Sequence, residues 1–312
     1  TQARQAGLEA LKKICRINSS RIGPTDVGFR LAPRLNAAGR LGSAEPALNL
    51  LMSNDPAPAA RLASQLEALN RQRHQDQNKL CLLALERLEE EISPDSRTVV
   101  LAGQGGPRGL LGLAASKVAE VTGKPTVLFS LEGAQAVGSG RSAGKFNLYS
   151  ALNELRHLFI SFGGHAQAAG LTIPADSMAE FKTSLEEVAA GRADLSDDVE
   201  LEVDMEATVG DLSALWRPLG ALEPFGQGNP APVVVIRGAK INDARPTDSG
   251  GGQHMKIYVG DGLNRWTMVG FNLGHRLCEI APLSDLALSL EISEHRGESS
   301  PNWRLLDFRP AG

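Results

Sequence analysis

Residues 97–133 read RTVVLAGQGGPRGLLGLAASKVAEVTGKPTVLFSLEG, and their pattern changes twice. The opening apolar run ends in glycines, which is typical of a buried strand. The run LLGLAASKVAEVT predicts a helix that ends at Gly123, because glycine readily adopts the left-handed conformation that closes a helix. KPTVLFSLEG then predicts a second strand. A strand, a helix and another strand in this order indicate an α/β domain.

The same alternation continues toward the C-terminus. AQAVGSGRSA predicts a third strand, NLYSALNELRHLF a helix, AGLTI a further strand and SMAEFKTSLEEVAAG a final helix. Together these segments predict a compact α/β domain of roughly 95 residues. We place it at residues 96–192.

Upstream lies a long segment, residues 56–95, that is rich in Ala and Leu up to residue 92 and has no glycine. Leucines at helical spacing flank a polar middle, NRQRHQDQNK, so the segment predicts one helix or two nearly collinear helices that link domains. We expect Asn70, Arg71 and Arg73 in this middle to be solvated; the alternative is that they line a groove between domains.

Downstream, residues 193–312 change to short alternating runs separated by Gly, Pro, Asp and Asn. Runs such as APVVVIRGAKI, QHMKIYVGD and RWTMVGF predict short strands, and their spacing favours a small β-barrel or sandwich. Their number fits a five-stranded oligonucleotide-binding (OB) barrel. The acidic run DLSDDVELEVDMEA (residues 194–207) is expected to be a solvated linker and strand edge.

Composition narrows the class of protein. The 312 residues are 42% apolar and 22% charged, which is typical of globular chains of two or three domains. No apolar run is long enough for a membrane span. Cys15, Cys81 and Cys278 are odd in number and far apart, so they favour a reducing cytoplasm over a disulfide framework or zinc site. Because Thr1 rather than Met comes first, we expect a longer protein.

Charge is unevenly distributed along the chain. The net charge is −4, yet residues 1–45 carry eight Lys or Arg against three Asp or Glu. A local excess of this kind is expected on a surface that faces phosphates.

Two segments combine arginines with glycines. RLAPRLNAAGRLG (residues 30–42) is interrupted by Pro and Gly and is predicted to be a loop, in which Arg34, Asn36 and Arg40 could bind phosphate or form structural ion pairs. VGSGRSAG (residues 137–144) predicts a turn after a strand. Its exposed N–H groups would form an anion site together with Ser139, Arg141 and Ser142. No Gly-Lys-Ser/Thr ending marks it as a Walker loop.

A third segment, FISFGGHAQAAG (residues 159–170), places two glycines before a histidine. Gly163 and Gly164 either form a tight turn or let a ligand lie against bare backbone. His165 could donate a hydrogen bond to a phosphate oxygen or carry a positive charge beside it.

FRLAPRLNAAGR, GSGRS and FGGHAQAAGLTI, in this order, resemble the later motifs of the DHH phosphoesterase superfamily. GLLGLAASKVAE, LEPFGQGNPAPV and QHMKIYV extend the resemblance to the RecJ family within it, over nearly the whole chain. The resemblance implies four parts: the end of a DHH phosphoesterase domain (1–55), a linking helix (56–95), a DHH-associated α/β domain (96–192) and an OB-fold barrel (193–312).

The family resemblance also implies a function, namely 5′→3′ hydrolysis of single-stranded DNA in repair and recombination. Two Mn²⁺ or Mg²⁺ ions would activate water. Their ligands would be Asp and His residues that include an Asp-His-His motif, which this sequence lacks. We therefore expect the metal ligands to precede Thr1, and we expect the chain alone to bind DNA without cleaving it. The implied partners are 5′-phosphorylated single-stranded DNA, single-strand-binding protein and repair helicases, with no membrane.

The family roles carry over to matching positions. Arg34, Asn36 and Arg40 would hold substrate phosphates, Ser139, Arg141 and Ser142 the 5′-phosphate, and Gly163 and Gly164 would make room beside the catalytic His165. In the barrel, the candidates for DNA contact are His254, Lys256, Tyr258, Trp266, Phe271 and Trp303, the aromatic ones by base stacking or as core residues.

Two other functions remain open. A non-catalytic DNA-binding or replication scaffold protein of the same superfamily would not need Arg141 and His165. A phosphodiesterase for short oligonucleotides or cyclic dinucleotides would not be expected to carry the barrel.

Overall fold

The computed structural model describes residues 5–18, 22–192, 201–247, 253–260, 262, 265–295 and 298–312. The chain separates into two compact units, Thr1–Arg16 with Gly28–Val199 and Ile17–Val27 with Glu200–Gly312. Each unit is described by itself below. Across the described ranges, no helix combines the length and the apolar character that crossing a membrane requires.

The first unit begins with helices that pack on one long helix. This helix, α4 (Pro56–Glu91), is continuous over 36 residues, which decides between the one-helix and two-helix predictions. The Asp55 side chain caps its N-terminus by accepting a hydrogen bond of 3.0 Å from the Ala57 N–H. The preceding elements are α1 (Ala6–Ile14), a π-helical segment (Asp26–Leu31), α2 (Ala32–Leu41) and α3 (Glu45–Met52).

A five-stranded sheet follows, in the order β1-β2-β3-β5-β4. The pair β1–β2 is parallel, and the other neighbours are antiparallel. The strands are β1 (Val99–Gln104), β2 (Thr126–Glu132), β3 (Gln135–Arg141), β4 (Ser161–His165) and β5 (Ala168–Pro174). The helices of this part are α5 (Arg108–Thr122), α6 (Leu148–Glu154) and α7 (Met178–Ala190).

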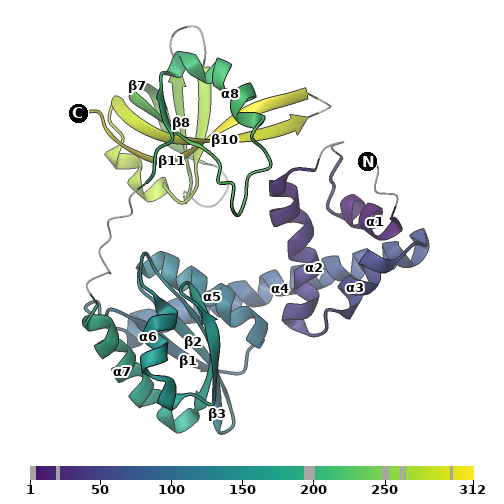
Figure 1. Ribbon diagram of the computed structural model, residues 1–312, viewed down its shortest axis with the longest axis vertical. Coiled ribbons are helices and arrows are strands. Elements are labelled where there is room, and N and C mark those ends of the chain that lie inside the picture. Colours follow the sequence, from purple (N-terminus) through teal and green to yellow (C-terminus); the bar gives the residue numbers. More distant parts are fainter. Residues whose placement is uncertain are drawn as a thin grey trace. The chain divides into compact units, whose positions relative to one another are not determined.

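The two faces of this sheet are covered differently (Figure 1). Helices α6 and α7 cover one face with a large core that includes Phe129, Phe146 and Phe181. Helices α4 and α5 cover the other face over β1 and β2. On that second face, the residues of β4 and β5 include exposed positions such as Gly163, His165 and Gly170. The sheet therefore keeps an open surface beside α5.

Both arginine-rich segments predicted as loops are regular structure. Residues 32–41 form α2, because Pro33 lies in the first turn, where a missing N–H costs nothing. Ser139 and Arg141 lie within β3 rather than on a turn after it. The two glycines that flank Ser139 serve packing: a Cβ at Gly138 would lie 2.6 Å from the Phe129 ring, and one at Gly140 would lie 2.9 Å from Leu148 Cδ2.

The glycine–histidine segment is also a strand. Gly163, Gly164 and His165 belong to β4, an edge strand of the sheet, and not to a tight turn. At Gly164 a Cβ would lie 2.3 Å from the Ala168 carbonyl oxygen, so only glycine fits against the neighbouring strand. At Gly163 no atom lies within 4 Å of such a Cβ, so this position faces open space.

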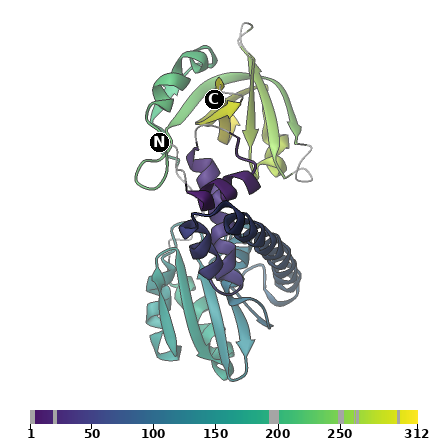
Figure 2. The ribbon, with the colours of Figure 1, turned by 90° about the vertical axis from the view of Figure 1, so that its right-hand side faces the viewer.

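The second unit is a closed barrel in which the strands follow the order β7-β8-β9-β11-β10 and β10 pairs back onto β7. Only β9 and β11 run parallel among these five pairings, and the strands curve around a shared interior (Figure 2). This is the five-stranded OB architecture, as predicted. Its elements are β6 (Met205–Ala207), α8 (Leu212–Gly220), β7 (Val233–Pro246), β8 (Met255–Gly260), β9 (Arg265–Gly270), β10 (Leu283–His295) and β11 (Glu298–Pro310).

Strand β8 shows why the barrel closes. Met255, Ile257 and Val259 are buried, and the residues between them are half-buried, which is the alternation that a barrel wall requires. Of the acidic run predicted as linker and strand edge, residues 194–200 lie outside the described ranges. Its last residues form β6, which pairs with β7.

Candidate nucleic-acid interface

Four arginines of the first unit form the feature that we call the arginine cluster: Arg34 and Arg40 of α2, Arg73 of α4 and Arg141 of β3. Burial lowers the pKa of Arg141 and of Arg73, and the positive charge of Arg40 lowers both further. Arg40 is therefore close enough to both side chains for like charges to repel. The fold brings together residues that the sequence places up to 107 positions apart.

The cluster has a net positive charge because most of its members have neutral partners. Arg34 donates to Glu67 at 2.6 Å. Arg40 donates to the Gly109 carbonyl oxygen at 3.0 Å. Arg141 donates to Ser139 Oγ at 3.2 Å and to the Gly140 carbonyl oxygen at 2.7 Å. Within the described ranges, three of the four guanidinium groups thus lack a carboxylate partner, and such a cluster suits an anion.

Two buried polar residues of α4, Asn70 and the cluster member Arg73, contradict the prediction from sequence. Asn70 and Arg73 are 5% and 8% exposed, whereas we expected solvated side chains. The signal was present in the helical period, because positions 59, 63, 66, 70 and 73 are all buried and repeat every three or four residues. The polar residues continue the buried stripe of α4 instead of interrupting it.

The hydrogen-bond acceptors of Arg73 are neutral side chains. Its guanidinium donates to Gln77 Oε1 at 2.9 Å and to Asn70 Oδ1 at 3.1 Å, and it contacts the His74 ring. Its Nε is buried and has no hydrogen-bond partner. Burial lowers the pKa of His74, and the charges of Arg73 and Arg34 lower it further, which favours the neutral imidazole over the cation.

Helix α5 approaches the cluster through two glycines that sequence reasoning did not single out. A Cβ at Gly109 would lie 2.4 Å from the Arg40 carbonyl oxygen, and one at Gly112 would lie 2.4 Å from Arg141 Nη2. Gly109 therefore needs to be glycine for α5 to lie against the backbone of α2, whereas a side chain at Gly112 would displace the Arg141 guanidinium. Pro107 at the N-cap provides no side-chain cap, so the first N–H groups of α5 add partial positive charge on the Arg40 side.

Beside Arg141 the sheet presents small residues in two registered rows. Ser139, Gly170 and Gly163 form one row across β3, β5 and β4; Arg141, Ala168 and His165 form the next. We call Gly163, Ala168 and Gly170 the glycine platform. No atom lies within 4 Å of a Cβ built on Gly163 or Gly170, so a ligand can reach the backbone there.

His165 stands at the far end of this platform and is exposed. Two strand spacings separate it from Arg141, which is about 10 Å between backbones. His165 Nδ1 accepts a hydrogen bond of 3.3 Å from the Gln167 N–H. The proton of the neutral ring therefore sits on Nε2, which is the atom available to donate.

The remaining candidates of this unit differ in their support. Asn36 is exposed on α2, one turn before Arg40 and so on the same side of the helix. Ser142 donates its hydroxyl to the Phe146 carbonyl oxygen, and its N–H donates to the Gln167 carbonyl oxygen at 3.0 Å. Ser142 thus fixes the end of β3, and its predicted contact with phosphate gains no support from the structure.

In the barrel, Lys256 and Tyr258 lie on the outward side of β8, between its three buried residues. Lys256 is registered opposite Arg245 of β7. The Arg245 guanidinium lies 5.0 Å from the centroid of the Tyr258 ring and also donates to its hydroxyl. A basic and aromatic strip therefore runs along the outer wall of the barrel.

The other barrel candidates fit less well. Trp303 is 2% exposed in the core, so the base-stacking alternative is wrong for it. Trp266 lies on the same face of β9 as the buried Met268 and packs against the same core with its Nε1 buried, which argues against the predicted stacking. His254 Nδ1 accepts from the Asn272 N–H at 3.0 Å and so fixes a turn. Phe271 is 45% exposed and lies 5.1 Å from the Arg304 guanidinium.

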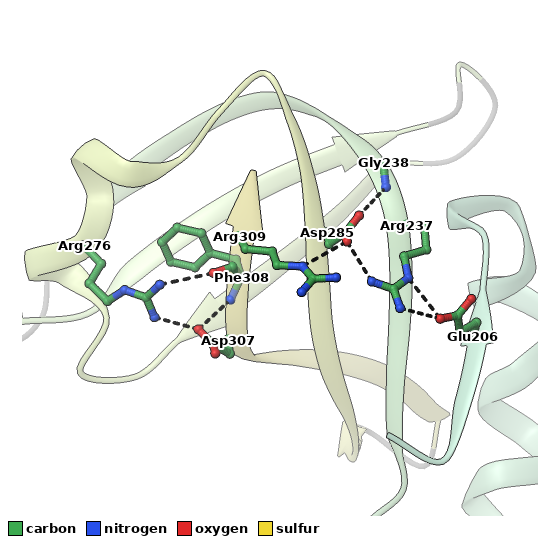
Figure 3. Close-up of polar contacts among 8 residues, drawn as sticks. All are labelled: Glu206, Arg237, Gly238, Arg276, Asp285, Asp307, Phe308 and Arg309. Atoms are coloured by element: carbon green, nitrogen blue, oxygen red, sulfur yellow. Dashed lines mark hydrogen bonds and ion pairs between the residues drawn. The ribbon is translucent and has the colours of Figure 1, made fainter. Parts of the chain in front are cut away.

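A second set of barrel arginines is neutralised (Figure 3). Asp285 accepts hydrogen bonds from the Gly238 N–H at 3.0 Å, from Arg237 at 2.8 Å and from Arg309 at 3.2 Å. These bonds, the one from Gly238 first, lower the pKa of Asp285 to about 2. Arg237 also pairs with Glu206 at 2.6 Å. We call these residues the Asp285 network.

Two domain families match consecutive parts of the chain. The DHHA1 domain matches residues 95–191, and the RecJ OB domain matches residues 203–307. The chain is 31% identical over 318 residues to the single-stranded-DNA-specific exonuclease RecJ of Bacillus subtilis, which covers 96% of the chain. It is 36% identical over 230 residues, 74% of the chain, to the exonuclease of the same name from Thermus thermophilus. The chain belongs to the RecJ family.

Solved RecJ structures share its fold. The crystal structures of RecJ from Thermus thermophilus with Mg²⁺ and with Mn²⁺ each match 98% of this chain at 28% identity and a TM-score of 0.79. The chain covers 46% and 44% of those two chains. It spans 40% of the Bacillus subtilis RecJ and 33% of the Thermus thermophilus RecJ. The predicted order of a DHH-associated domain and an OB barrel is confirmed.

Those RecJ crystals contain divalent ions, so we asked whether this chain could hold one. In the part of the chain that the structure describes, no group of three or more His, Cys, Asp or Glu side chains could hold a metal ion. The arginine cluster is cationic, and its one carboxylate partner, Glu67, is committed to Arg34. The cluster therefore does not fit a divalent cation. That the metal ligands lie outside this sequence remains a prediction.

Proposed function

We propose that this chain is the substrate-binding part of a RecJ-type exonuclease, an enzyme that hydrolyses single-stranded DNA from its 5′ end. One observation carries the proposal: among the described residues, three partly or fully buried guanidinium groups, on Arg40, Arg73 and Arg141, lack a carboxylate partner, and Arg141 borders the open glycine platform. Burying a cation without a counter-charge is costly, and a bound phosphate would offset that cost.

The 5′-phosphate is proposed to bind at Arg141 and Ser139. A guanidinium binds phosphate through two parallel hydrogen bonds, and these bonds are about twice as strong as neutral ones. The Ser139 hydroxyl already contacts Arg141 at 3.2 Å, so one anion can engage both side chains. Arg40 lies next to Arg141 and adds attraction for the same charge.

The following nucleotides are proposed to cross the glycine platform toward His165. Since Arg141 and His165 are about 10 Å apart at the backbone, a strand with successive phosphates can contact both. Bare backbone at Gly163 and Gly170 lets that strand approach closely. His165 Nε2 would donate to a phosphate oxygen near the scissile bond.

The barrel is proposed to hold more of the single strand by stacking and by charge. Tyr258 presents an aromatic ring, and Lys256 and Arg245 present cations on the same outer strip. OB barrels combine these two kinds of contact to bind single strands without sequence preference.

Cleavage itself would need the divalent ions that are present in the RecJ crystals, because they make an attacking hydroxide from water. The described residues are proposed to bind the substrate strand. Among them, no group of three or more His, Cys, Asp or Glu side chains could hold those ions. Repair and recombination as the setting, single-strand-binding protein and helicases as partners, and a cytoplasmic location are proposed from the family resemblance and from the odd number and wide spacing of the three cysteines.

The test is binding and cleavage in the same samples. The purified chain is incubated with 5′-phosphorylated or 5′-hydroxyl single-stranded oligonucleotides and Mn²⁺, and both anisotropy and product length are followed. We expect tighter binding of the phosphorylated strand, weakened by salt, and no shortening. Equal binding of both strands would contradict the proposed 5′-phosphate site, and steady shortening would contradict the proposed lack of metal ligands.

A further inference from the structure

The linking helix α4 buries a cation in its middle, and no carboxylate among the described residues balances it. Arg73 is 8% exposed, its hydrogen-bond acceptors are the neutral side chains of Asn70 and Gln77, and its Nε has none. An arginine kept only to stabilise a helix bundle would be expected to face a carboxylate. The nearest carboxylate of the cluster, that of Glu67, is bound to Arg34 at 2.6 Å.

We propose that Arg73 is a positioning residue of the phosphate site, which acts through Arg40. This inference rests on the function proposed above. Helix α4, which carries Arg73, packs against α2, which carries Arg40. After burial, the charge of Arg40 lowers the pKa of Arg73 and of Arg141. Asn70 holds the Arg73 guanidinium in place at 3.1 Å.

The physical role of Arg73 is to add positive potential where little solvent screens it. Its charge repels Arg40 from the helix and so keeps the Arg40 guanidinium directed at Gly109 and at the anion. Two like charges near each other destabilise the empty protein, and an anion that binds between Arg40 and Arg141 relieves this repulsion. Arg73 therefore lowers the stability of the free protein and raises its affinity for the anion.

This trade predicts two effects of opposite sign for one substitution. In Arg73→Met, a side chain of similar length removes the charge, so the melting temperature without anions should rise. The same variant should bind a 5′-phosphorylated oligonucleotide about tenfold more weakly, the scale expected for one charge acting across several ångströms. Its melting temperature should respond less to inorganic phosphate than that of the wild type.

Arg71→Met is the matched control. Arg71 is exposed on the same helix, so the variant makes the same change in net charge outside the cluster. It should bind and melt like the wild type. Arg73→Lys keeps the charge on a different head group and should recover most of the phosphate response, which a role in packing alone would not predict.

The experiment compares the wild type with Arg73→Met, Arg73→Lys, Arg71→Met and Arg141→Ala, with thermal melting in inorganic phosphate or chloride and anisotropy with the phosphorylated oligonucleotide. Arg73→Met with a lower melting temperature and an unchanged phosphate response would overturn the inference. If Arg73→Met does not fold, an Arg73→Lys variant without a phosphate response would overturn it. If the wild type itself shows no phosphate response that Arg141→Ala removes, the proposed function fails first.

Discussion

The arginine cluster and the Asp285 network use the same side chain in opposite ways. In the cluster, Arg40, Arg73 and Arg141 have neutral partners, and their charges repel one another. In the network, Arg237 and Arg309 share the Asp285 carboxylate. The first arrangement is incomplete without an anion, whereas the second is complete in the free protein.

This difference shows which arginines to assign to function. A charge whose partner lies in the same chain contributes to the fold, and on the surface its contribution is small. A partly buried charge without such a partner costs stability and is retained for a ligand. Counting arginines along the sequence cannot make this distinction, because the sequence does not show which carboxylate each arginine meets in the fold.

The largest effect is expected when one arginine is removed from the arginine cluster and, in a second variant, one from the Asp285 network. Arg141→Ala should weaken binding of a 5′-phosphorylated single strand roughly 10- to 100-fold, because a hydrogen bond to a charged group is worth about 1.5–3 kcal/mol. Arg237→Ala should leave affinity within about twofold, the scale of a surface ion pair. Anisotropy titrations at several salt concentrations measure both. Equal losses in the two variants would remove the distinction between the regions.

A second test asks whether the barrel also carries functional contacts. Tyr258→Ala should weaken single-strand binding about tenfold, since stacking of one base contributes roughly 1–3 kcal/mol. The loss should be the same for 5′-phosphate and 5′-hydroxyl strands, because stacking of a base on an aromatic ring does not depend on the charge at the 5′ end. Thr267→Ala, at the position registered opposite Tyr258, serves as the control. A loss of affinity confined to phosphorylated strands would mean that Tyr258 contacts the 5′ end of the strand, contrary to the proposal.

A third test separates glycines that serve the ligand from glycines that serve the fold. Gly163→Ala adds a methyl group in open space, so the melting temperature should stay or rise while DNA affinity falls several-fold. Gly164→Ala places its methyl 2.3 Å from the Ala168 carbonyl oxygen, so it should lower the melting temperature. Thermal melting and anisotropy on both variants measure this. Unchanged DNA binding by Gly163→Ala would mean that no strand crosses the platform.

The smallest expected effect concerns pH. The pKa of Asp285 lies at about 2 in the folded protein, below its ordinary 3.8, so its stabilising contribution is present above about pH 4 and is lost as the pH falls toward 2. Asp285→Asn should therefore have a melting temperature a few degrees below that of the wild type at pH 7. At pH 2 the two proteins should melt at the same temperature. The three tryptophans, all in the barrel unit, report its unfolding.

Asp243→Asn is the control for this experiment. Asp243 is exposed on the same barrel, and the substitution makes the same change in charge. It should melt like the wild type at every pH. A difference between Asp285→Asn and the wild type that grows as the pH falls would contradict the role of the ionised carboxylate.

The sequence predicted most of the α/β elements because their signals are local. Gly123 does adopt the left-handed conformation at the end of α5, and the alternation of β8 is clear in the letters alone. The same local reasoning failed where glycine and proline serve tertiary purposes. Pro33 begins a helix instead of breaking it, and Gly138 and Gly140 admit side chains of neighbouring elements instead of forming a turn.

The site was predictable in part. Motif resemblance indicated Arg34, Arg40 and Arg141, although it could not show that Arg34 is neutralised by Glu67. Arg73 was overlooked because a polar letter on a long helix suggests solvent, and only the buried period of α4 indicates otherwise. The position of Gly112 depends on how closely α5 approaches β3, which no local pattern contains.

Gly109 and Gly112 let helix α5 contact both arginines of the phosphate site. They lie three residues apart on one helix face, one against Arg40 and the other against Arg141, with a rise of about 4.5 Å between them. The contacts that α5 makes with the Arg40 backbone and with the Arg141 guanidinium are thus spaced by the rise of the helix, not by loop conformation. The size of anion that fits between the two arginines should accordingly survive changes in the loop before α5. A single residue inserted between the two glycines would turn one of them away by about 100° and alter that size.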